Sequence, residues 1–190
     1  MESHKKPVRK GALFVYIVIT AAVFLICGGY LFIDTYFPLK YEDVVIKYAD
    51  AHGLDPNLVC GVIATESKFS SDTVSGKGAV GLMQIMPDTG EWVAGKLGIK
   101  DYSEDCLTDP VINIRIGTWY LEFLFDRYEE ESTAIAAYNA GHGNVDEWLK
   151  NENYSQNGKT LYKIPFEETE KYVKKVERAC EIYKTIYKVG

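Results

Sequence analysis

The stretch Leu54–Ser70, LDPNLVCGVIATESKFS, combines a strong helix start with a single acid near its far end. Asp55 is a favourable N-cap residue and Pro56 suits the first helical position, so the sequence predicts a helix that begins here. The residues that follow are apolar on both faces, which is typical of a helix in the centre of a domain. Glu66 ends this run, where a carboxylate opposes the helix dipole. The stretch therefore predicts a central helix that carries one poorly solvated acid.

Two interpretations of Glu66 follow from this position. It is either a structural acid near a helix end, which can also have a perturbed pKa, or a catalytic acid in a cleft. Burial raises the pKa of a carboxyl group, and a protonated acid can protonate the leaving oxygen of a glycosidic bond. Most glycosidases use two carboxylates, and the stretch supplies no second one beside Glu66. The spacing alone leaves both interpretations open.

The remainder of the body, residues 41–190, predicts a mainly α domain without a strand pattern of useful length. Apolar residues recur at helical spacing in five further segments: 41–53, 87–98, 109–128, 132–141 and 168–188. Gly53, Gly98 and Gly141 are placed to end three of these helices, and Ser132 is placed as the N-cap of one. We therefore expect one helical domain from residue 41 onward.

Two short segments of the body bring polar residues among apolar or small ones. Residues 75–86, SGKGAVGLMQIM, are rich in glycine and predict a loop or a short irregular strand pair. Within this segment, Gln84 needs hydrogen-bond partners if it is buried, and a sugar hydroxyl is one candidate. Tyr138 and Asn139 come just before a helix stop, where they serve either the helix end or a cleft.

The first organised segment, residues 11–33, carries no charge and is long enough to cross a bilayer as a helix. We interpret it as a retained transmembrane helix that lies in the lipid bilayer. A basic tail (1–10) precedes this helix and a linker (34–40) follows it. A cleaved signal peptide is the main alternative, whereas a lipoprotein anchor at Cys27 is disfavoured by Ile26. The basic tail predicts a cytoplasmic N-terminus and an extracytoplasmic body.

The charge distribution and the histidine pattern exclude two classes of site. The chain has a net charge of −6, but its first 40 residues carry +3, so the remainder carries −9. An acidic body argues against a nucleic-acid partner. The three histidines, His4, His52 and His142, are far apart and no CxxC pair exists, so we expect no metal site.

Three motifs in the body resemble the soluble-lytic-transglycosylase family in order and spacing. They are ATESKFSSDTVSGKGAVGLMQIMPDTG (64–90), AAYNAG (136–141) and IPFEETEKYV (164–173). The resemblance covers residues 41 to 188 and implies a lysozyme-like, α-helical fold. It also implies a peptidoglycan lytic transglycosylase, a bacterial lyase of the cell wall that cuts the β-1,4 bond between N-acetylmuramic acid and N-acetylglucosamine. The product has a 1,6-anhydromuramoyl end, and no metal or organic cofactor takes part.

By this resemblance Glu66 is the sole general acid and base. It protonates the glycosidic oxygen and then accepts the proton of the muramoyl C6 hydroxyl, which attacks C1. The substrate supplies its own nucleophile, so no second protein carboxylate is needed. The resemblance further implies a substrate-binding set that surrounds the acid. This set is Ser67, Ser75, Gln84, Met86, Tyr138, Asn139, Glu168 and Tyr172.

Three other functions are compatible with a body of this kind. The first is a hydrolase in the manner of goose-type lysozyme, in which Asp72 or Asp88 would position a water molecule. The second is a membrane-anchored module that binds the cell wall without catalysis, which an intact Glu66 disfavours. The third is a chitin-cleaving enzyme, which the close match to the peptidoglycan family disfavours.

The cysteines of the body allow one internal disulfide at most, because Cys60, Cys106 and Cys180 are odd in number. If Tyr172 lies beside Glu66, as the resemblance implies, and their helices are antiparallel, Cys60 and Cys180 reach the same level. An oxidising exterior then permits a Cys60–Cys180 bridge. Buried free thiols are the equal alternative.

Overall fold

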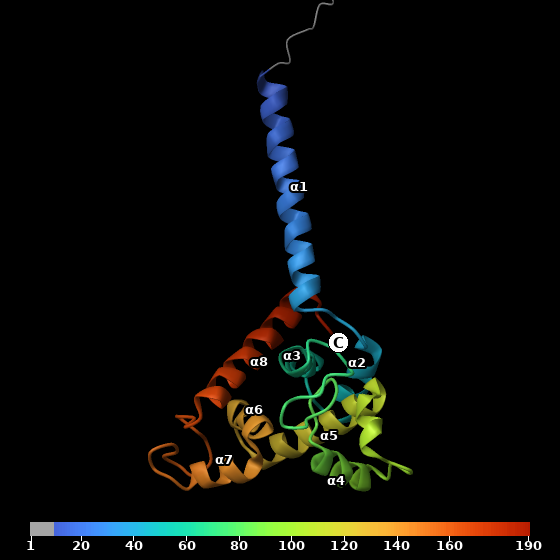
Figure 1. Cartoon of the computed structure of the whole chain (residues 1–190). Coiled ribbons are helices and arrows are strands. Elements are labelled where there is room, and N and C mark those ends of the chain that lie inside the picture. The colour runs from blue at the N-terminus through green and yellow to red at the C-terminus, as the bar shows by residue number, and fades with distance from the viewer. Residues whose placement is uncertain (1–9) are drawn as a thin grey trace, which may run out of the picture. The chain divides into compact units, whose positions relative to one another are not determined.

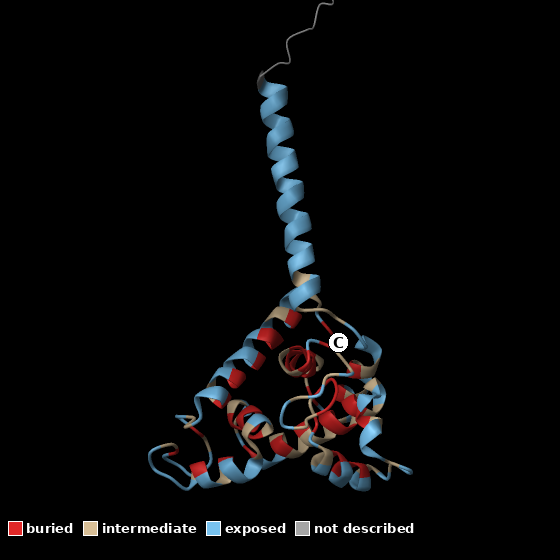
Figure 2. Cartoon of the chain, in the orientation of Figure 1, coloured by how far each residue is buried: buried red, intermediate tan, exposed pale blue. Residues whose placement is uncertain are grey.

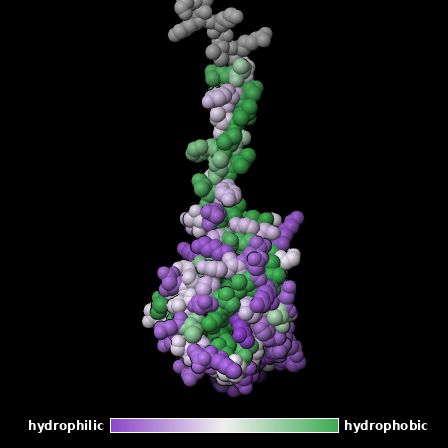
Figure 3. All heavy atoms as spheres, turned by 90° about the vertical axis from the view of Figure 1, so that its right-hand side faces the viewer, coloured by the Kyte–Doolittle hydropathy of each residue, from purple (hydrophilic) through white to green (hydrophobic). Residues whose placement is uncertain are grey.

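The computed structural model describes residues 10–190, which belong to two compact units, residues 1–38 and 39–190. The described part of the first unit is built on helix α1, Lys10–Tyr36, and the predicted basic tail lies outside the described residues except for Lys10. Predominantly apolar side chains line α1 (Figure 3). The segment Gly11–Tyr36 has a mean hydropathy of 2.5 in its most apolar window, and none of that window is buried.

The helix α1 extends three residues past the predicted span of 11–33, into the segment predicted as a linker. At 1.5 Å per residue its length is about 40 Å, which is enough to cross the hydrocarbon core of a bilayer. Length and composition therefore fit a membrane span, and the transmembrane assignment itself stays a prediction.

The second unit is helical throughout its regular structure, as predicted (Figure 1). Its elements are α2 (Glu42–Ala51), α3 (Pro56–Glu66), α4 (Pro87–Leu97), the 3₁₀ helix η1 (Glu104–Thr108), α5 (Pro110–Arg127), α6 (Glu131–Ala140), α7 (His142–Leu149) and α8 (Glu167–Ile186). The glycine-rich loop contains only isolated bridges, from Val80 to Val74 and to Ile85. The prediction of a loop or irregular strand pair over residues 75–86 is thus confirmed.

The centre of the body is helix α3, which is buried at every position from Asn57 to Ala64 (Figure 2). It packs along α8 at very close range. A Cβ atom added at Gly61 would lie 2.9 Å from the backbone nitrogen of Cys180 and 3.0 Å from the Val176 carbonyl oxygen. The small residue at position 61 therefore lets the backbones of the two helices approach each other, and the prediction of a central helix is confirmed.

The predicted helix ends of this region are largely confirmed. The Asp55 side chain accepts a hydrogen bond from the Asn57 backbone N–H at 2.8 Å, as an N-cap does. Gly53 and Gly98 have φ values of +62°, in the left-handed region that favours glycine after a helix.

The predicted N-cap at Ser132 is wrong by two positions. Helix α6 starts at Glu131, and Glu130 occupies the N-cap position. The Glu130 carboxylate accepts a hydrogen bond from the Thr133 hydroxyl at 3.0 Å. Ser132 therefore lies inside the first turn, and no side-chain hydrogen bond caps the start of the helix. Helices η1 and α7 were not predicted, since both are short and α7 begins among glycines.

The structure holds Cys60 and Cys180 as buried free thiols, so the predicted bridge is not formed. Burial raises the pKa of the Cys60 thiol to about 12 and that of Cys180 to about 11. Both groups are therefore protonated thiols at neutral pH. Free thiols in the core, the second interpretation of these residues, describe the structure.

Candidate active site

Glu66 is the last residue of α3 and lines a cleft of about 440 Å³. The cleft brings together seven of the nine residues that the sequence analysis placed at the site: Glu66, Ser75, Gln84, Met86, Tyr138, Asn139 and Glu168. The central helix, the glycine-rich loop, the end of α6 and the start of α8 each contribute. Segments that are far apart in sequence thus converge on one carboxyl group.

Tyr172 lies beside Glu66 but does not line the cleft. It is buried on α8, and its hydroxyl donates a 2.7 Å hydrogen bond to Glu66 Oε1. Burial and the nearby Glu66 charge raise the pKa of Tyr172 well above its usual value, so the tyrosine stays neutral and remains a donor. This position agrees with the prediction that Tyr172 belongs to the site. Tyr172 contacts Glu66 and is not part of the cleft lining.

The surroundings of Glu66 shift its acidity toward neutrality. Burial raises the pKa of the carboxyl group to about 7, while the hydrogen bond from Tyr172 acts in the opposite direction. A carboxyl group with this pKa populates both its protonated and its charged form at neutral pH. It can therefore donate a proton in one step and accept one in the next.

The amide groups in the cleft have fixed orientations. Gln84 has a φ of +48°, and its Nε2 atom donates to the carbonyl oxygens of Thr73 and Gly81, both at 3.0 Å. Its Oε1 atom is then the acceptor that remains for a ligand. The Asn139 oxygen accepts a 2.8 Å hydrogen bond from the buried Thr169 hydroxyl, which leaves the amide N–H groups as donors.

Ser67 does not line the cleft. It is buried, and its hydroxyl donates to the Leu82 carbonyl oxygen at 2.8 Å. Its predicted role as a substrate contact is therefore replaced by a structural one, because this bond ties the end of α3 to the glycine-rich loop. The local sequence ESK gives no sign of this partner, which lies 15 residues further along the chain.

The cleft continues into a second part of about 240 Å³. This part shares Gln84, Met86, Tyr138 and Asn139 with the first and adds Ile85, Thr89, Tyr120, Ala140 and Gly141. Met86 is 43% exposed between the two parts. The arrangement is an elongated groove with the acid in one part, which suits a polymer better than a compact small molecule.

A family model for the transglycosylase SLT domain matches residues 43–161. This match covers more than half of the chain. The chain belongs to the transglycosylase SLT domain family.

Relatives of this SLT domain include soluble and membrane-bound enzymes. The soluble lytic murein transglycosylase of Escherichia coli (strain K12) is 36% identical over 143 residues, which cover 74% of this chain and 22% of the relative. Membrane-bound lytic murein transglycosylase C of Actinobacillus pleuropneumoniae (serotype 5b, strain L20) is 32% identical over 166 residues, with 76% and 46% covered. The chain thus spans less than half the length of these relatives.

Solved structures of lytic transglycosylases have the same fold as the SLT domain. An inactive mutant of Slt from Pseudomonas aeruginosa aligns with a TM-score of 0.73 at 34% identity, covering 83% of this chain and 26% of that one. The 70 kDa soluble lytic transglycosylase, in complex with bulgecin A, aligns with a TM-score of 0.69 at 34% identity, covering 78% and 25%. The lysozyme-like fold class is therefore confirmed. Together, the apolar helix α1 and the membrane-bound relatives indicate membrane anchoring.

The SLT domain does not place the acids of the hydrolase alternative in the cleft. Asp72 and Asp88 are both exposed, and neither lines either part of the groove. Asp72 instead accepts a 2.7 Å hydrogen bond from the Ser70 hydroxyl. Glu168 is the other acid of the cleft lining, and it is exposed, 4.0 Å from the equally exposed Lys77.

Asn113 of α5 is a positioning residue of the SLT domain that the sequence analysis missed. It is fully buried, accepts a hydrogen bond from the Met83 N–H at 2.8 Å, and donates to the carbonyl oxygens of Val80 and Leu107. It therefore holds the loop that presents Gln84. An asparagine at a buried position of a helical pattern is a weak signal that could have identified it.

Proposed function

We propose that the chain is a peptidoglycan lytic transglycosylase that cleaves the β-1,4 bond between N-acetylmuramic acid and N-acetylglucosamine. The observation that carries the proposal is the environment of Glu66, a cleft carboxyl group with a pKa of about 7 that accepts a hydrogen bond from Tyr172. The names of the relatives, lytic murein transglycosylases, support the same activity. Peptidoglycan glycan strands are then the substrate.

The proposed reaction uses one carboxyl group twice. Protonated Glu66 donates its proton to the glycosidic oxygen as the bond between that oxygen and C1 breaks. The muramoyl C6 hydroxyl then attacks C1, and the Glu66 carboxylate takes the hydroxyl proton. The Tyr172 hydroxyl stabilises the carboxylate between the two steps. One C–O bond is exchanged for another, no water is consumed, and Glu66 returns to its protonated form.

The polar groups of the cleft suit the acetamido and hydroxyl groups of the sugars. Gln84 offers an acceptor and Asn139 offers donors, as their internal hydrogen bonds require. The Ser75 oxygen accepts from the Ala79 N–H at 2.9 Å, so its own O–H can donate to a sugar. We assign these residues, with Met86 and Tyr138, to substrate binding.

The test of the catalytic assignment is the variant Glu66→Gln. Its amide cannot donate or accept the proton, so we expect turnover of peptidoglycan to fall by about 10²–10⁴-fold. The matched control is Glu91→Gln, an exposed acid outside both parts of the groove, which should keep full turnover. A folded Glu66→Gln protein with more than a tenth of the original turnover would refute the assignment.

We further infer that residues 11–33 cross the membrane once, with the N-terminus in the cytoplasm and residues 41–190 outside. The basic residues that precede the span, Lys5, Lys6, Arg9 and Lys10, support this orientation, since residues 34–40 on the other side carry no net charge. Protease added to intact spheroplasts should then digest the body. Protection of the body would reverse the orientation, and a free mature body would identify the span as a cleaved signal.

A further inference from the structure

Five aromatic rings lie together next to the second part of the cleft. They are Trp92 of α4, Trp119, Tyr120 and Phe123 of α5, and His142 of α7, and we call them the aromatic shelf. Trp92 meets Trp119, Tyr120 and Phe123 edge to face, with ring centroids 5.4, 6.2 and 5.1 Å apart. Phe123 meets His142 in the same manner at 6.1 Å.

The shelf is continuous with the groove through three of its lining residues. Tyr120 belongs to both, and its ring lies 5.6 Å from that of Tyr138 in the groove. Thr89 lies one helical turn before Trp92 on α4, and Gly141 directly precedes His142. A strand that leaves the groove at this end therefore meets the shelf next.

The rings of the shelf are more exposed to solvent than rings that only fill the space between helices. Trp92 is 38% exposed although three rings surround it, His142 is exposed, and the other rings are half-buried. Clustered aromatic side chains at the surface beside a binding groove are typical of a recognition surface. Sugar rings suit such a surface because their C–H faces are apolar while their hydroxyl groups stay in water.

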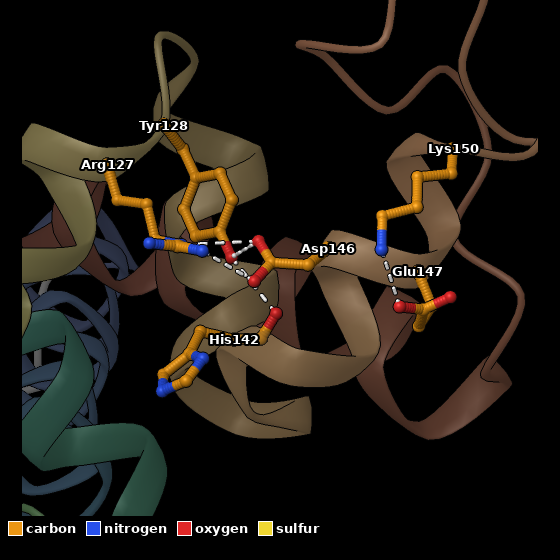
Figure 4. A network of polar contacts seen from close by, with 6 residues as sticks. All are labelled: Arg127, Tyr128, His142, Asp146, Glu147 and Lys150. Carbon is orange, nitrogen blue, oxygen red and sulfur yellow. Dashed lines mark hydrogen bonds and ion pairs between the residues drawn. The ribbon is translucent and has the colours of Figure 1, made fainter.

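A polar network joins the end of α5 to α7, the two helices that carry Phe123 and His142 of the shelf (Figure 4). Arg127 binds the Asp146 carboxylate at 2.6 Å. The Tyr128 hydroxyl bonds to Asp146 at 2.9 Å and to the His142 carbonyl oxygen at 3.1 Å. A surface that is ordered before binding loses less conformational entropy when a ligand arrives.

We propose that the aromatic shelf binds sugar units of the glycan strand beyond the groove, so that the enzyme selects long strands over short ones. This inference rests on the proposed function, since it gives the same substrate a longer binding surface. Stacking on Trp92 is its central contact.

The test measures binding of the full chain in detergent, in a Glu66→Gln background that prevents turnover. The probes are purified peptide-free glycan strands, one short enough to fill the groove alone and one several sugars longer. Trp92→Ala should weaken binding of the long strand about tenfold and that of the short strand less than twofold, a ratio expected for loss of one stacking contact. Trp92→Tyr should recover most of the difference.

The matched control is Tyr162→Ala, which removes an exposed aromatic side chain that lines neither part of the groove. It should leave the affinity ratio of the two strands unchanged. Intact binding of the short strand by Trp92→Ala shows that the domain is folded.

Several results would overturn the proposal, and they separate it from the proposed function. Equal weakening for both strands, or no weakening, would refute the shelf alone. A change of oligomeric state in Trp92→Ala, with the strand ratio unchanged, would assign the shelf to a protein interface. Failure of the Glu66→Gln background to bind either strand would refute the proposed function, and the shelf with it.

Discussion

The proposed chemistry depends on the carboxyl group of Glu66, whose pKa is shifted in opposite directions by burial and by Tyr172. Burial removes water from the charged form, while the Tyr172 hydroxyl gives that form one hydrogen bond. The outcome is a pKa of about 7, well above the ordinary value of 4.5. The charged form is therefore less stable in the folded protein than in the unfolded chain, and this has consequences for stability and for turnover.

The variant Glu66→Gln tests the effect of the raised pKa on the stability of the fold. Because the folded pKa exceeds the unfolded one, the wild type loses stability as the pH rises from about 4.5 through about 7. We expect Glu66→Gln to raise the free energy of unfolding by up to about 3 kcal/mol at pH 8 and to leave it nearly unchanged at pH 4. Urea unfolding at the two pH values measures this, and an equal gain at both would contradict the buried-acid account.

The variant Tyr172→Phe tests the effect of the raised pKa on the pH dependence of turnover. The proposed first step needs protonated Glu66, so turnover should fall as the pH rises through about 7. Removing the Tyr172 hydroxyl removes the hydrogen bond that lowers the pKa of Glu66. The alkaline limb of the pH–turnover profile should therefore move to higher pH. Tyr162→Phe is the control, and an alkaline limb that does not move in Tyr172→Phe would rule out this contact as the cause.

At the scale of elements, the site depends on how closely α3 and α8 pack, because Glu66 lies on one helix and Tyr172 on the other. In Gly61→Ala the new methyl group would meet backbone atoms of α8 at 2.9–3.0 Å. Overpacking of this kind costs about 1–3 kcal/mol and shifts the backbone. We expect the variant to lose that much stability in urea unfolding, and to lose turnover because Tyr172 moves relative to Glu66.

The control for this prediction is Gly95→Ala on α4, where an added Cβ meets nothing within 4 Å. Alanine in an exposed helix interior should stabilise the domain by about 0.5–1 kcal/mol. If Gly61→Ala behaves like Gly95→Ala, the close packing of α3 on α8 is not what positions the site.

The elements that the sequence predicts well are those with local signals. Asp55 caps its helix through a residue two positions away, and Gly53 and Gly98 end helices through their own backbone conformation. Helices α7 and η1 are short and depend on tertiary packing, so their local sequence is insufficient. Ser132 was misplaced because Glu130, a less common N-cap residue, starts the helix instead.

The same distinction between local and long-range signals applies to the candidate site. The resemblance gave Glu66 and six other residues that line the groove, including Gln84 and Asn139, because it carries positions as well as residue types. The roles of Ser67 and Asn113 could not be predicted, since their hydrogen-bond partners lie 15 and 30 residues away in sequence. Which atom of a side chain is already bonded becomes visible only in the folded structure.

At the scale of the whole molecule, an apolar helix precedes a domain of the SLT family, and that domain spans a minor part of its soluble relatives. The sequence predicts a span over residues 11–33 and a catalytic domain over residues 41–190, and this division stays a prediction. The central claim about the protein's proposed function is chemical. One carboxyl group acts as both acid and base in cleaving the glycan, and the substrate supplies the nucleophile. The proposed reaction differs from hydrolysis because no oxygen atom from water enters the product.

Mass spectrometry of the products tests this claim most directly. The full chain, in detergent and without added metal, is incubated with purified peptidoglycan in water enriched in ¹⁸O. The account predicts fragments that end in 1,6-anhydro-N-acetylmuramic acid, one water molecule lighter than a reducing end and free of ¹⁸O. Reducing N-acetylmuramic acid ends that carry ¹⁸O as the main product would contradict it and identify the protein as a hydrolase.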